Sequence, residues 1–349
     1  MLERGSSQFG IVDYCVFAGM LVFSGAIGLY TSYIGNKSPE EFLMGNRSFK
    51  PMPVAMSLLT SFVSSISLLG YSGEVYAYGA QISMFVLGVI LAILFSMYFA
   101  LPVLYPLKLT SVTEYVELRF KSERLRLVIS FLTLLKSLLY LGVCLYAPTI
   151  ALVTVTKLNT MTYIFLLGVI CTIYSAFGGI RGVIWTDVFQ LSVMMVGLIS
   201  VTIIGCVQNG GFIKTLNMSV DGGRVDIFDF NPSPLVRHTF LNVIAFGFFL
   251  YIHTFGSDQI NMQRMCSVKT MKNAKSVLTY NIYGMILIYF LIFVGGLVAY
   301  ATYQGCDPMA LGIIEKKEEI MTFFLIDKLS FIPGLPGIFV ATLIGGTLR

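Results

Sequence analysis

Long apolar stretches separated by short polar segments dominate this sequence. A helix needs roughly 20 apolar residues to cross a membrane, and stretches of that length recur along the chain. We expect spans at residues 9–35, 52–72, 78–105, 125–156, 160–178, 183–207, 237–257 and 275–304, followed by a shorter one that begins near residue 335. The pattern predicts an all-α polytopic membrane protein.

The second of these spans is unusually polar for a membrane helix. Ser and Thr occupy almost half of positions 57–70, and Gly70, Gly73 and Gly79 follow closely. Irregular backbone is tolerated at membrane depth only where it is buried in protein or lines a cavity, because unpaired groups in lipid are costly. We interpret the segment as a broken helix, of the kind that builds ion and substrate sites in secondary transporters. The alternative is a polar seam for helix packing.

Composition supports the membrane assignment. Apolar residues make up 56% of the chain, charged residues 12%, and the mean hydropathy is +0.82, values that exclude an ordinary soluble domain. The N-terminus lacks the basic region and cleavage site of a signal peptide, so the first span is expected to stay in the protein. The six cysteines show no spacing that predicts a disulfide.

Lys and Arg are denser in the loops after the first, third, fifth and seventh spans than in the other loops. By the positive-inside rule, we expect those loops to be cytoplasmic and the N-terminus to be extracellular. We expect the membrane to be the plasma membrane. Residues 208–236 then form an extracellular loop, where Asn217 in an Asn-Met-Ser sequon is a candidate for glycosylation. The net charge of +5 comes from the inner loops and does not indicate a nucleic-acid partner.

Several short motifs occur in a fixed order along the chain. They are Glu41-Phe-Leu-Met-Gly-Asn-Arg-Ser48, residues 57–76 with the ending Gly-Tyr-Ser-Gly-Glu-Val-Tyr, residues 109–120, residues 176–190, residues 234–240, residues 259–264 and Cys306-Asp-Pro308. With these motifs the sequence resembles the sodium/solute symporter family, on the branch of sodium-coupled monocarboxylate and multivitamin transporters. The resemblance extends from about Phe9 to Leu348.

The resemblance implies a leucine-transporter-like inverted-repeat fold with one extra N-terminal helix, residues 9–35. Residues 52–207 would form the first five-helix repeat. Residues 237–349 would form an incomplete second repeat, with two full helices and part of a third. Binding sites in such folds lie near the membrane midplane, between the discontinuous helices of the two repeats.

The resemblance also implies a set of sodium ligands. One Na⁺ would be held by the backbone carbonyls of Thr60 and Val63 in the first broken helix and by hydroxyls on a later helix. Asp187, near the start of the sixth span, would lie on the cation path; the alternative is a carboxylate favoured by a helix N-terminus. No transition-metal site is expected, because His238 and His253 show no metal-ligand spacing.

By resemblance, the seventh span contains a second broken helix around Gly256, and the substrate lies between the two breaks. The residues expected to line this pocket are Ser64, Ser67, Tyr251, Thr254, Phe255 and Gln259. The N-terminus of the half helix after the first break is suited to a carboxylate. The expected substrate is a small organic anion, either a monocarboxylate or a vitamin acid such as biotin or pantothenate.

Charged residues inside the spans have competing interpretations. Lys136 lies near the middle of the fourth span, where a charge costs ~2.5–3.5 kcal/mol. It could attract an anionic substrate, with Tyr140 one turn further on, or it could snorkel or pair with a carboxylate. Relatives often have Gln at this position, and Asn where this chain has Asp258, which is expected to face the cytoplasmic vestibule. Glu74 is expected to pair with a base, and His253 to be a hydrogen-bonded packing residue.

The last span is short. Residues 334–348 would extend ~22 Å as a helix, against a hydrocarbon core of ~30 Å, and Arg349 stands where relatives continue into a serine-rich run with sodium-binding hydroxyls. We therefore expect a truncated second repeat and incomplete transport by this form.

The predicted function is sodium-coupled symport by alternating access, with Na⁺ as the coupling ion and membrane lipid as the surroundings. The alternative is a non-transporting form that associates with a full-length carrier and modulates it. Neither an enzyme motif nor a phosphate-binding loop for an ATP-driven pump is found in the sequence.

Overall fold

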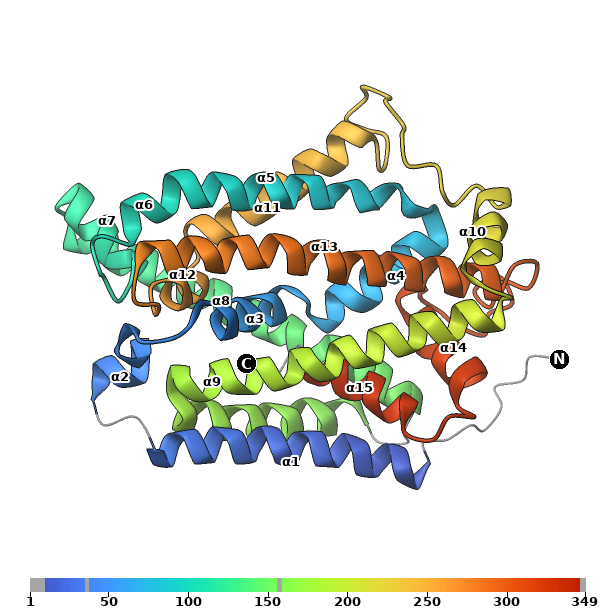
Figure 1. Ribbon diagram of the computed structural model, residues 1–349, viewed down its shortest axis with the longest axis horizontal. Helices are drawn as coiled ribbons and strands as arrows, with labels where there is room; N and C mark the ends of the chain where they lie inside the picture. Colours follow the sequence, from blue (N-terminus) through green and yellow to red (C-terminus); the bar gives the residue numbers. More distant parts are fainter. Residues whose placement is uncertain (1–9, 35–37, 156–158, 346–349) are drawn as a thin grey trace.

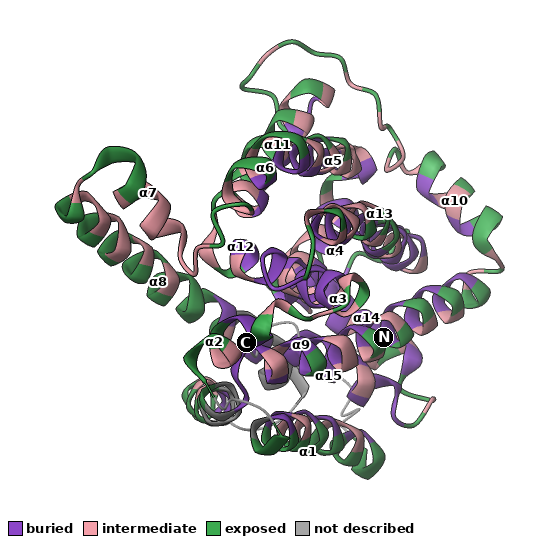
Figure 2. Cartoon of the chain, turned by 60° about the vertical axis from the view of Figure 1, so that its left-hand side comes forward, coloured by how far each residue is buried: buried purple, intermediate pink, exposed green. Residues whose placement is uncertain are grey.

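The computed structural model describes residues 10–34, 38–155 and 159–345. Within these ranges the regular structure is helical, apart from one isolated bridge between Phe49 and Val268. Most of the long helices run along the long axis of the molecule (Figure 1). Figure 2 shows the most buried ribbons at the centre, in α3 and α4, and exposed residues along α1 and α8 at the periphery.

Five segments of the described chain are long and apolar enough to cross a membrane. They lie in α1 (Ile11–Ile34), in the run of η2 (Ala80–Met84), α5 (Phe85–Phe95), η3 (Ser96–Ala100) and α6 (Leu101–Leu104), in α8 (Glu123–Val155), in α9 (Thr160–Gln208) and in α13 (Met271–Thr302). α15 (Leu335–Gly345) is a shorter apolar helix. The expected last span, residues 334–348, extends past the end of α15, and residues 346–349 lie outside the described residues.

Two further spans are bent pairs of helices. They are α3 (Pro51–Phe62) with α4 (Ser65–Tyr78), and α11 (Phe240–Gly256) with α12 (Gln259–Met265). The axes bend by 58° in the first pair and by 60° in the second. Both breaks fall where the sequence predicts them, around Ser64 and Gly256.

α9 contains two of the expected spans. The helix is interrupted at Gly179, whose backbone has φ 55° and ψ −167°. Glycine adopts this conformation without the steric cost that a side chain would bring. The loop expected between residues 178 and 183 is therefore a turn at one glycine.

Short helices occupy several segments that the sequence suggests are loops. They are α2 (Pro39–Met44), η1 (Gly45–Arg47), α7 (Val112–Phe120), α10 (Phe212–Asp221), η4 (Lys317–Glu319) and α14 (Ile320–Leu329). Local caps explain two of them: the Ser38 hydroxyl accepts from Glu41 N at 3.1 Å, and the Ser111 hydroxyl accepts from Thr113 N at 3.2 Å. Such caps satisfy amides that have no partner at a helix start.

α5 and α11 approach each other closely at two glycines. A Cβ atom on Gly88 would lie 2.1 Å from Ile244 O, and one on Gly247 would lie 2.2 Å from Phe85 O. Small residues at helix contacts allow the backbones to pack in a membrane, where the hydrophobic effect does not drive association. The position of α11, and hence of the second break, depends on this contact.

Asp13 attaches α1 to the start of α15. Its Oδ1 atom accepts hydrogen bonds from Gly334 N at 3.0 Å and from Gly337 N at 3.1 Å, and the residue is 6% exposed. A carboxylate is favoured at a helix N-terminus, where the unpaired amides carry positive partial charge. The first and last described helices are thus joined by a buried polar contact.

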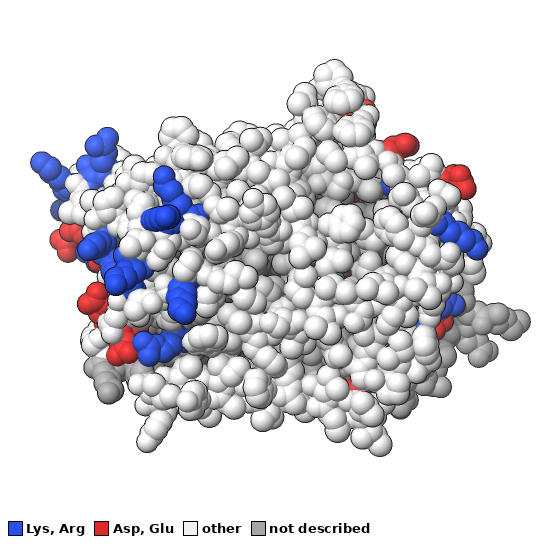
Figure 3. Space-filling model, viewed as in Figure 1, with Lys and Arg blue, Asp and Glu red and all other residues white. Residues whose placement is uncertain are grey.

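Charged side chains lie at the two ends of the molecule. Figure 3 shows Lys and Arg gathered at the end where α2, α7 and α12 lie, with fewer charges at the opposite end and a broad uncharged band between them. The band carries many exposed apolar side chains, such as Leu134 and Leu138 on α8. A surface of this kind faces lipid, and the chain is a multi-pass membrane protein.

Candidate functional site

Val63 and Ser64 form the first break. Val63 has φ −98° and ψ 79°, and Ser64 has φ −84° and ψ 170°, so neither backbone is helical. Val63 N still bonds to Leu59 O at 3.1 Å. Within the described part of the chain, no hydrogen bond ends on the carbonyl oxygens of Thr60, Ser61 or Val63. Two of these three are the carbonyls that the resemblance assigns to Na⁺.

The N-terminus of α4 begins directly after the break and is buried. The Ser64 side chain makes no capping hydrogen bond. The Ser65 hydroxyl is buried and has no partner among the described residues. The Ser67 hydroxyl, in contrast, donates to Phe62 O at 3.1 Å. Unpaired amides and hydroxyls at a helix start are suited to an anion.

The second break lies between Gly256 and Gln259. The carbonyl of His253 accepts from the amides of Ser257 and Asp258 at 2.9 and 3.1 Å. The carbonyl of Thr254 accepts from the Asn261 side chain at 3.0 Å. This break is therefore partly closed by polar groups of its own segment.

Aromatic rings bring the two breaks together. The Phe62 ring, at the end of α3, lies 4.5 Å from the Phe255 ring and 5.9 Å from the Tyr251 ring, measured between centroids. The Tyr251 hydroxyl is 2.6 Å from the hydroxyl of Tyr289 on α13. The sequence predicts Tyr251 and Phe255 here but gives no signal for Phe62 or Tyr289.

Asp187, on α9, packs against α3 close to the first break and belongs to a network of buried polar groups. Ser57 Oγ donates to Asp187 Oδ2 at 2.6 Å, and the Arg264 guanidinium is 3.4 Å from the same oxygen. The Thr60 hydroxyl, which donates to Met56 O at 2.7 Å, also lies 3.1 Å from the Asp187 carbonyl oxygen. Arg264 also donates to the Ser57 carbonyl at 3.1 Å and to the Ser61 hydroxyl. Because Ser57 belongs to α3 and Arg264 to α12, this network joins one half of each broken helix.

Lys136 lies at the second break. Its Nζ atom is 3.1 Å from Asp258 Oδ1 and 2.8 Å from His253 Nε2. Of the interpretations that the sequence allows, a carboxylate-paired lysine is the one observed. The Lys136 side chain is nevertheless 53% exposed, so it is accessible from the surroundings of the break. Tyr140, one turn along α8, is exposed as well.

Gln259 is attached to the loop between α6 and α7. Its side chain accepts from Val112 N at 2.7 Å and donates to Thr110 O at 3.0 Å. The same residues line a small, open pocket at the α12 end of the molecule. Cys266 also lines it, and burial raises the pKa of this thiol to about 11.

Glu74 pairs with bases at the opposite end, as expected. It interacts with Arg237 Nε at 2.9 Å, with His238 Nε2 at 2.7 Å and with the Lys317 ammonium group. The Arg237 guanidinium also lies over the Tyr78 ring, 4.2 Å from its centroid. The cluster joins α4 to the two loops at this end.

Asn217, the candidate glycosylation site, lies on α10. Its side chain is exposed, whereas Ser219 of the same sequon is buried and donates to Thr215 O at 2.9 Å. The sequon is thus part of a short helix rather than of an extended loop.

Comparison with solved structures supports this architecture. A Na⁺-coupled sialic acid symporter in a substrate-bound, outward-open state matches with a TM-score of 0.87 over 98% of this chain and 71% of that chain. The two sequences are 23% identical, so the likeness concerns the fold. It confirms the expected leucine-transporter-like architecture.

The sequence also matches curated relatives along nearly all of its length. Sodium-coupled monocarboxylate transporter 1 of Homo sapiens is 41% identical over 347 residues, which are 99% of this chain and 57% of the relative. The sodium/iodide cotransporter of Homo sapiens is 37% identical over 342 residues, which are 97% of this chain and 53% of the relative. The chain spans about half the length of the curated relatives that it matches. The family model described as "Sodium:solute symporter family" covers residues 42–348, and this chain therefore belongs to that family.

Proposed function

We propose that this chain acts in the sodium-coupled symport of a small organic anion, such as a monocarboxylate or a vitamin acid. The observation that carries the proposal is the pair of breaks. The carbonyls of Thr60 and Val63 at the first break accept no hydrogen bond within the described chain, and the neighbouring Phe62 ring contacts the Phe255 and Tyr251 rings of the second. The substrates in the names of the relatives above, a monocarboxylate and iodide, are anions.

Na⁺ binds, in this proposal, to the carbonyl oxygens of Thr60 and Val63. Carbonyls freed by an unwound helix segment coordinate Na⁺ in transporters with broken helices. Asp187 lies on the cation path in this proposal, and its backbone carbonyl oxygen is 3.1 Å from the Thr60 hydroxyl. The carboxylate is paired with the Arg264 guanidinium at 3.4 Å, and in this proposal it acts on the cation path through that network.

The organic anion binds beside the N-terminus of α4. The buried Ser65 hydroxyl and the uncapped amides there provide donors for a carboxylate. The other residues proposed for this pocket are Ser64, Ser67, Tyr251, Thr254 and Phe255, with Lys136, Tyr140 and Gln259 on the side of the second break. Na⁺ favours one conformation by binding it more tightly, and alternating access follows when the helices move around the loaded site.

The orientation in the plasma membrane is also proposed. The end with α2, α7 and α12 carries most of the Lys and Arg, which favours the cytoplasmic side for it and the extracellular side for the N-terminus. A glycan on Asn217, detected as a mass shift that an endoglycosidase removes and that Asn217→Gln abolishes, would agree with this orientation.

Binding of radioactive Na⁺ to the purified full chain in lipid nanodiscs tests the proposal. We expect saturable binding that excess K⁺ does not displace, with a lower half-saturating Na⁺ concentration when pyruvate is present. Asp187→Asn should weaken Na⁺ binding, whereas Asp221→Asn, an exposed change on α10, should not. Absence of Na⁺-selective binding by folded protein would contradict the proposal. Pyruvate uptake by the human monocarboxylate transporter, with and without this chain, separately tests association with a full-length carrier.

A further inference from the structure

The corner between α7 and α8, residues 118–128, carries basic side chains without partners. Residues 119–126 hold one acid, Glu123, and four bases, which are Arg119, Lys121, Arg124 and Arg126. Arg126 pairs with Glu117 at 2.7 Å. The other three bases are exposed, and within the described part of the chain no ion pair or hydrogen bond reaches their side chains.

The nearby acids do not neutralise these three bases. Glu117 is taken up by Arg126, and Glu114 accepts from the Thr110 amide at 3.2 Å. Glu123 lies in the first turn of α8, where the helix amides favour a carboxylate. An excess of positive charge therefore remains at the corner.

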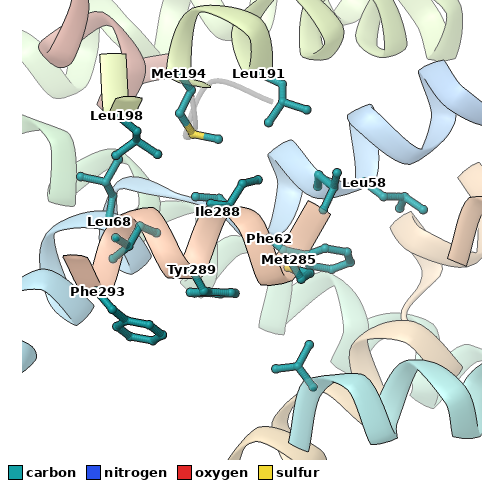
Figure 4. Packing of buried hydrophobic residues seen from close by; sticks show 14 of the residues in the cluster. Leu58, Phe62, Leu68, Leu191, Met194, Leu198, Met285, Ile288, Tyr289 and Phe293 are labelled. Atoms are coloured by element: carbon teal, nitrogen blue, oxygen red, sulfur yellow. The ribbon is translucent and has the colours of Figure 1, made fainter. Parts of the chain in front are cut away.

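Exposed apolar side chains lie among these bases. They are 60%, 64%, 62% and 55% exposed in Leu118, Phe120, Leu127 and Val128. No residue of α7 is buried, whereas the core in Figure 4 is built from apolar side chains of α3, α4, α9 and α13. Apolar groups interleaved with bases are typical of segments in a membrane interface, with the apolar groups at the acyl boundary and the charges among the headgroups.

The corner also lies at the membrane boundary. The candidate span of α8 begins at Glu123, and Leu134 and Leu138 further along it belong to the uncharged band. Figure 2 shows α7 and α8 projecting from the body of the molecule. The start of α7 is held to that body, because Val112 N donates to Gln259 Oε1 at 2.7 Å. The bases therefore stand where the lipid-facing surface meets the charged end.

We propose that this corner is a docking surface for the anionic phospholipid headgroups of the adjoining leaflet. Arg119, Lys121 and Arg124 bind the headgroup oxygens, and Leu118 and Phe120 reach the acyl boundary. Anionic headgroups attract bases beside a span over about a Debye length. A lipid fits the surface better than a free anion, because only a lipid also covers the apolar side chains. The docking needs neither Na⁺ nor the organic anion and is independent of the proposed function.

Quenching by brominated lipids tests the proposal, because bromine quenches tryptophan fluorescence on contact and this chain has a single tryptophan, Trp185. Trp185→Phe/Phe120→Trp moves the reporter to the corner of the full chain. The liposomes are phosphatidylcholine with a fraction of brominated phosphatidylserine or, in parallel, of brominated phosphatidylcholine. We expect stronger quenching by the brominated phosphatidylserine.

Two further variants of the reporter chain locate the effect. Arg119→Gln/Arg124→Gln should reduce the preference for phosphatidylserine by roughly two- to fivefold for each charge removed. Lys269→Gln/Lys272→Gln removes two exposed bases outside the corner and should keep the preference. The proposal is overturned if the reporter shows no preference, or if both double variants lose it to the same extent.

Hydrogen–deuterium exchange of the wild type is a second measurement and needs no substitution. We expect slower exchange of the amides in residues 113–122 in nanodiscs that contain phosphatidylserine than in phosphatidylcholine alone. The difference should shrink at about 1 M salt, where the Debye length is about 3 Å. Equal exchange in the two lipids overturns the proposal. Equal protection by inorganic phosphate in phosphatidylcholine nanodiscs also overturns it, because the site would then be one for free anions.

Discussion

The two broken helices bend by nearly the same angle, 58° and 60°, but they treat their backbone differently. At the first break, the carbonyls of Thr60 and Val63 are buried and accept no hydrogen bond from the described chain. At the second, the Asn261 side chain donates to Thr254 O and the Ser257 hydroxyl to His253 O. The first break keeps acceptors available to a ligand, whereas the second uses its own side chains to satisfy part of its backbone.

The charged side chains beside the two breaks also differ in how deeply they are buried. Beside the first break, the side chains of Arg264 and Asp187 are 7% and 1% exposed. At the second break, those of Lys136 and Asp258 are 53% and 19% exposed. A buried ion pair is expensive to break because one charge is left without a partner. The buried polar network therefore lies beside the break whose carbonyls accept no hydrogen bond within the described chain.

The largest expected effect comes from Arg264→Met. Loss of the guanidinium leaves the buried Asp187 carboxylate without its cation, which costs about 3–5 kcal/mol of unfolding free energy. The measurement is denaturant-induced unfolding in detergent. The double variant Asp187→Asn/Arg264→Met should recover part of the loss, because it leaves no unpaired charge. Equal stability of Arg264→Met and Lys136→Met would remove the distinction between the two regions.

Gly247→Ala should have an intermediate effect. The new methyl group would overlap the Phe85 carbonyl on α5, so the helices have to separate, at about 1–3 kcal/mol. Gly256→Ala is the control within the second break itself, because a Cβ atom there meets its nearest neighbour at 3.5 Å. If the two variants unfold alike, close packing of α5 and α11 does not hold the second break in place.

The smallest effect on stability is expected for Lys136→Met. Loss of the ammonium group leaves Asp258 with the hydrogen bond that the Asn261 side chain donates to its Oδ2 atom at 3.2 Å, so we expect a smaller loss than for Arg264→Met. The same variant tests the proposed attraction of an anion, since the effect of pyruvate on Na⁺ binding should weaken while Na⁺ binding alone is kept. A loss of stability comparable to that of Arg264→Met would show that the second break also depends on its charges.

The breaks could be predicted from the sequence because their causes are local. Hydroxyl residues and glycines in positions 57–79 weaken a membrane helix whatever it packs against. The bend lies among them, at Val63 and Ser64. The resemblance adds the second break and the aromatic residues Tyr251 and Phe255. The pairing of Glu74 with bases was also predictable, since a carboxylate at a span end needs a cation.

Tyr289 and Arg264 could not be assigned in this way, because their partners are distant in the sequence. Tyr289 meets Tyr251 across 38 residues, and nothing in the apolar pattern of α13 distinguishes it from Tyr283, which faces outward. Lys136 and Asp258 each stand out as unusual charges, but only the packing of α8 against the second break makes them partners. Long-range contacts of this kind come from tertiary structure, which local patterns do not encode.

The hydrogen bond from Gly334 to Asp13 spans 321 residues. A membrane protein is inserted while it is synthesised, from its N-terminus onward, so α1 enters the bilayer long before the residues that cap its carboxylate exist. Before then the carboxylate has its local partner, the Gly10 amide, which donates to Asp13 Oδ2 at 2.9 Å. The contact between α1 and the start of α15 can therefore form only after residues 334–337 have been synthesised.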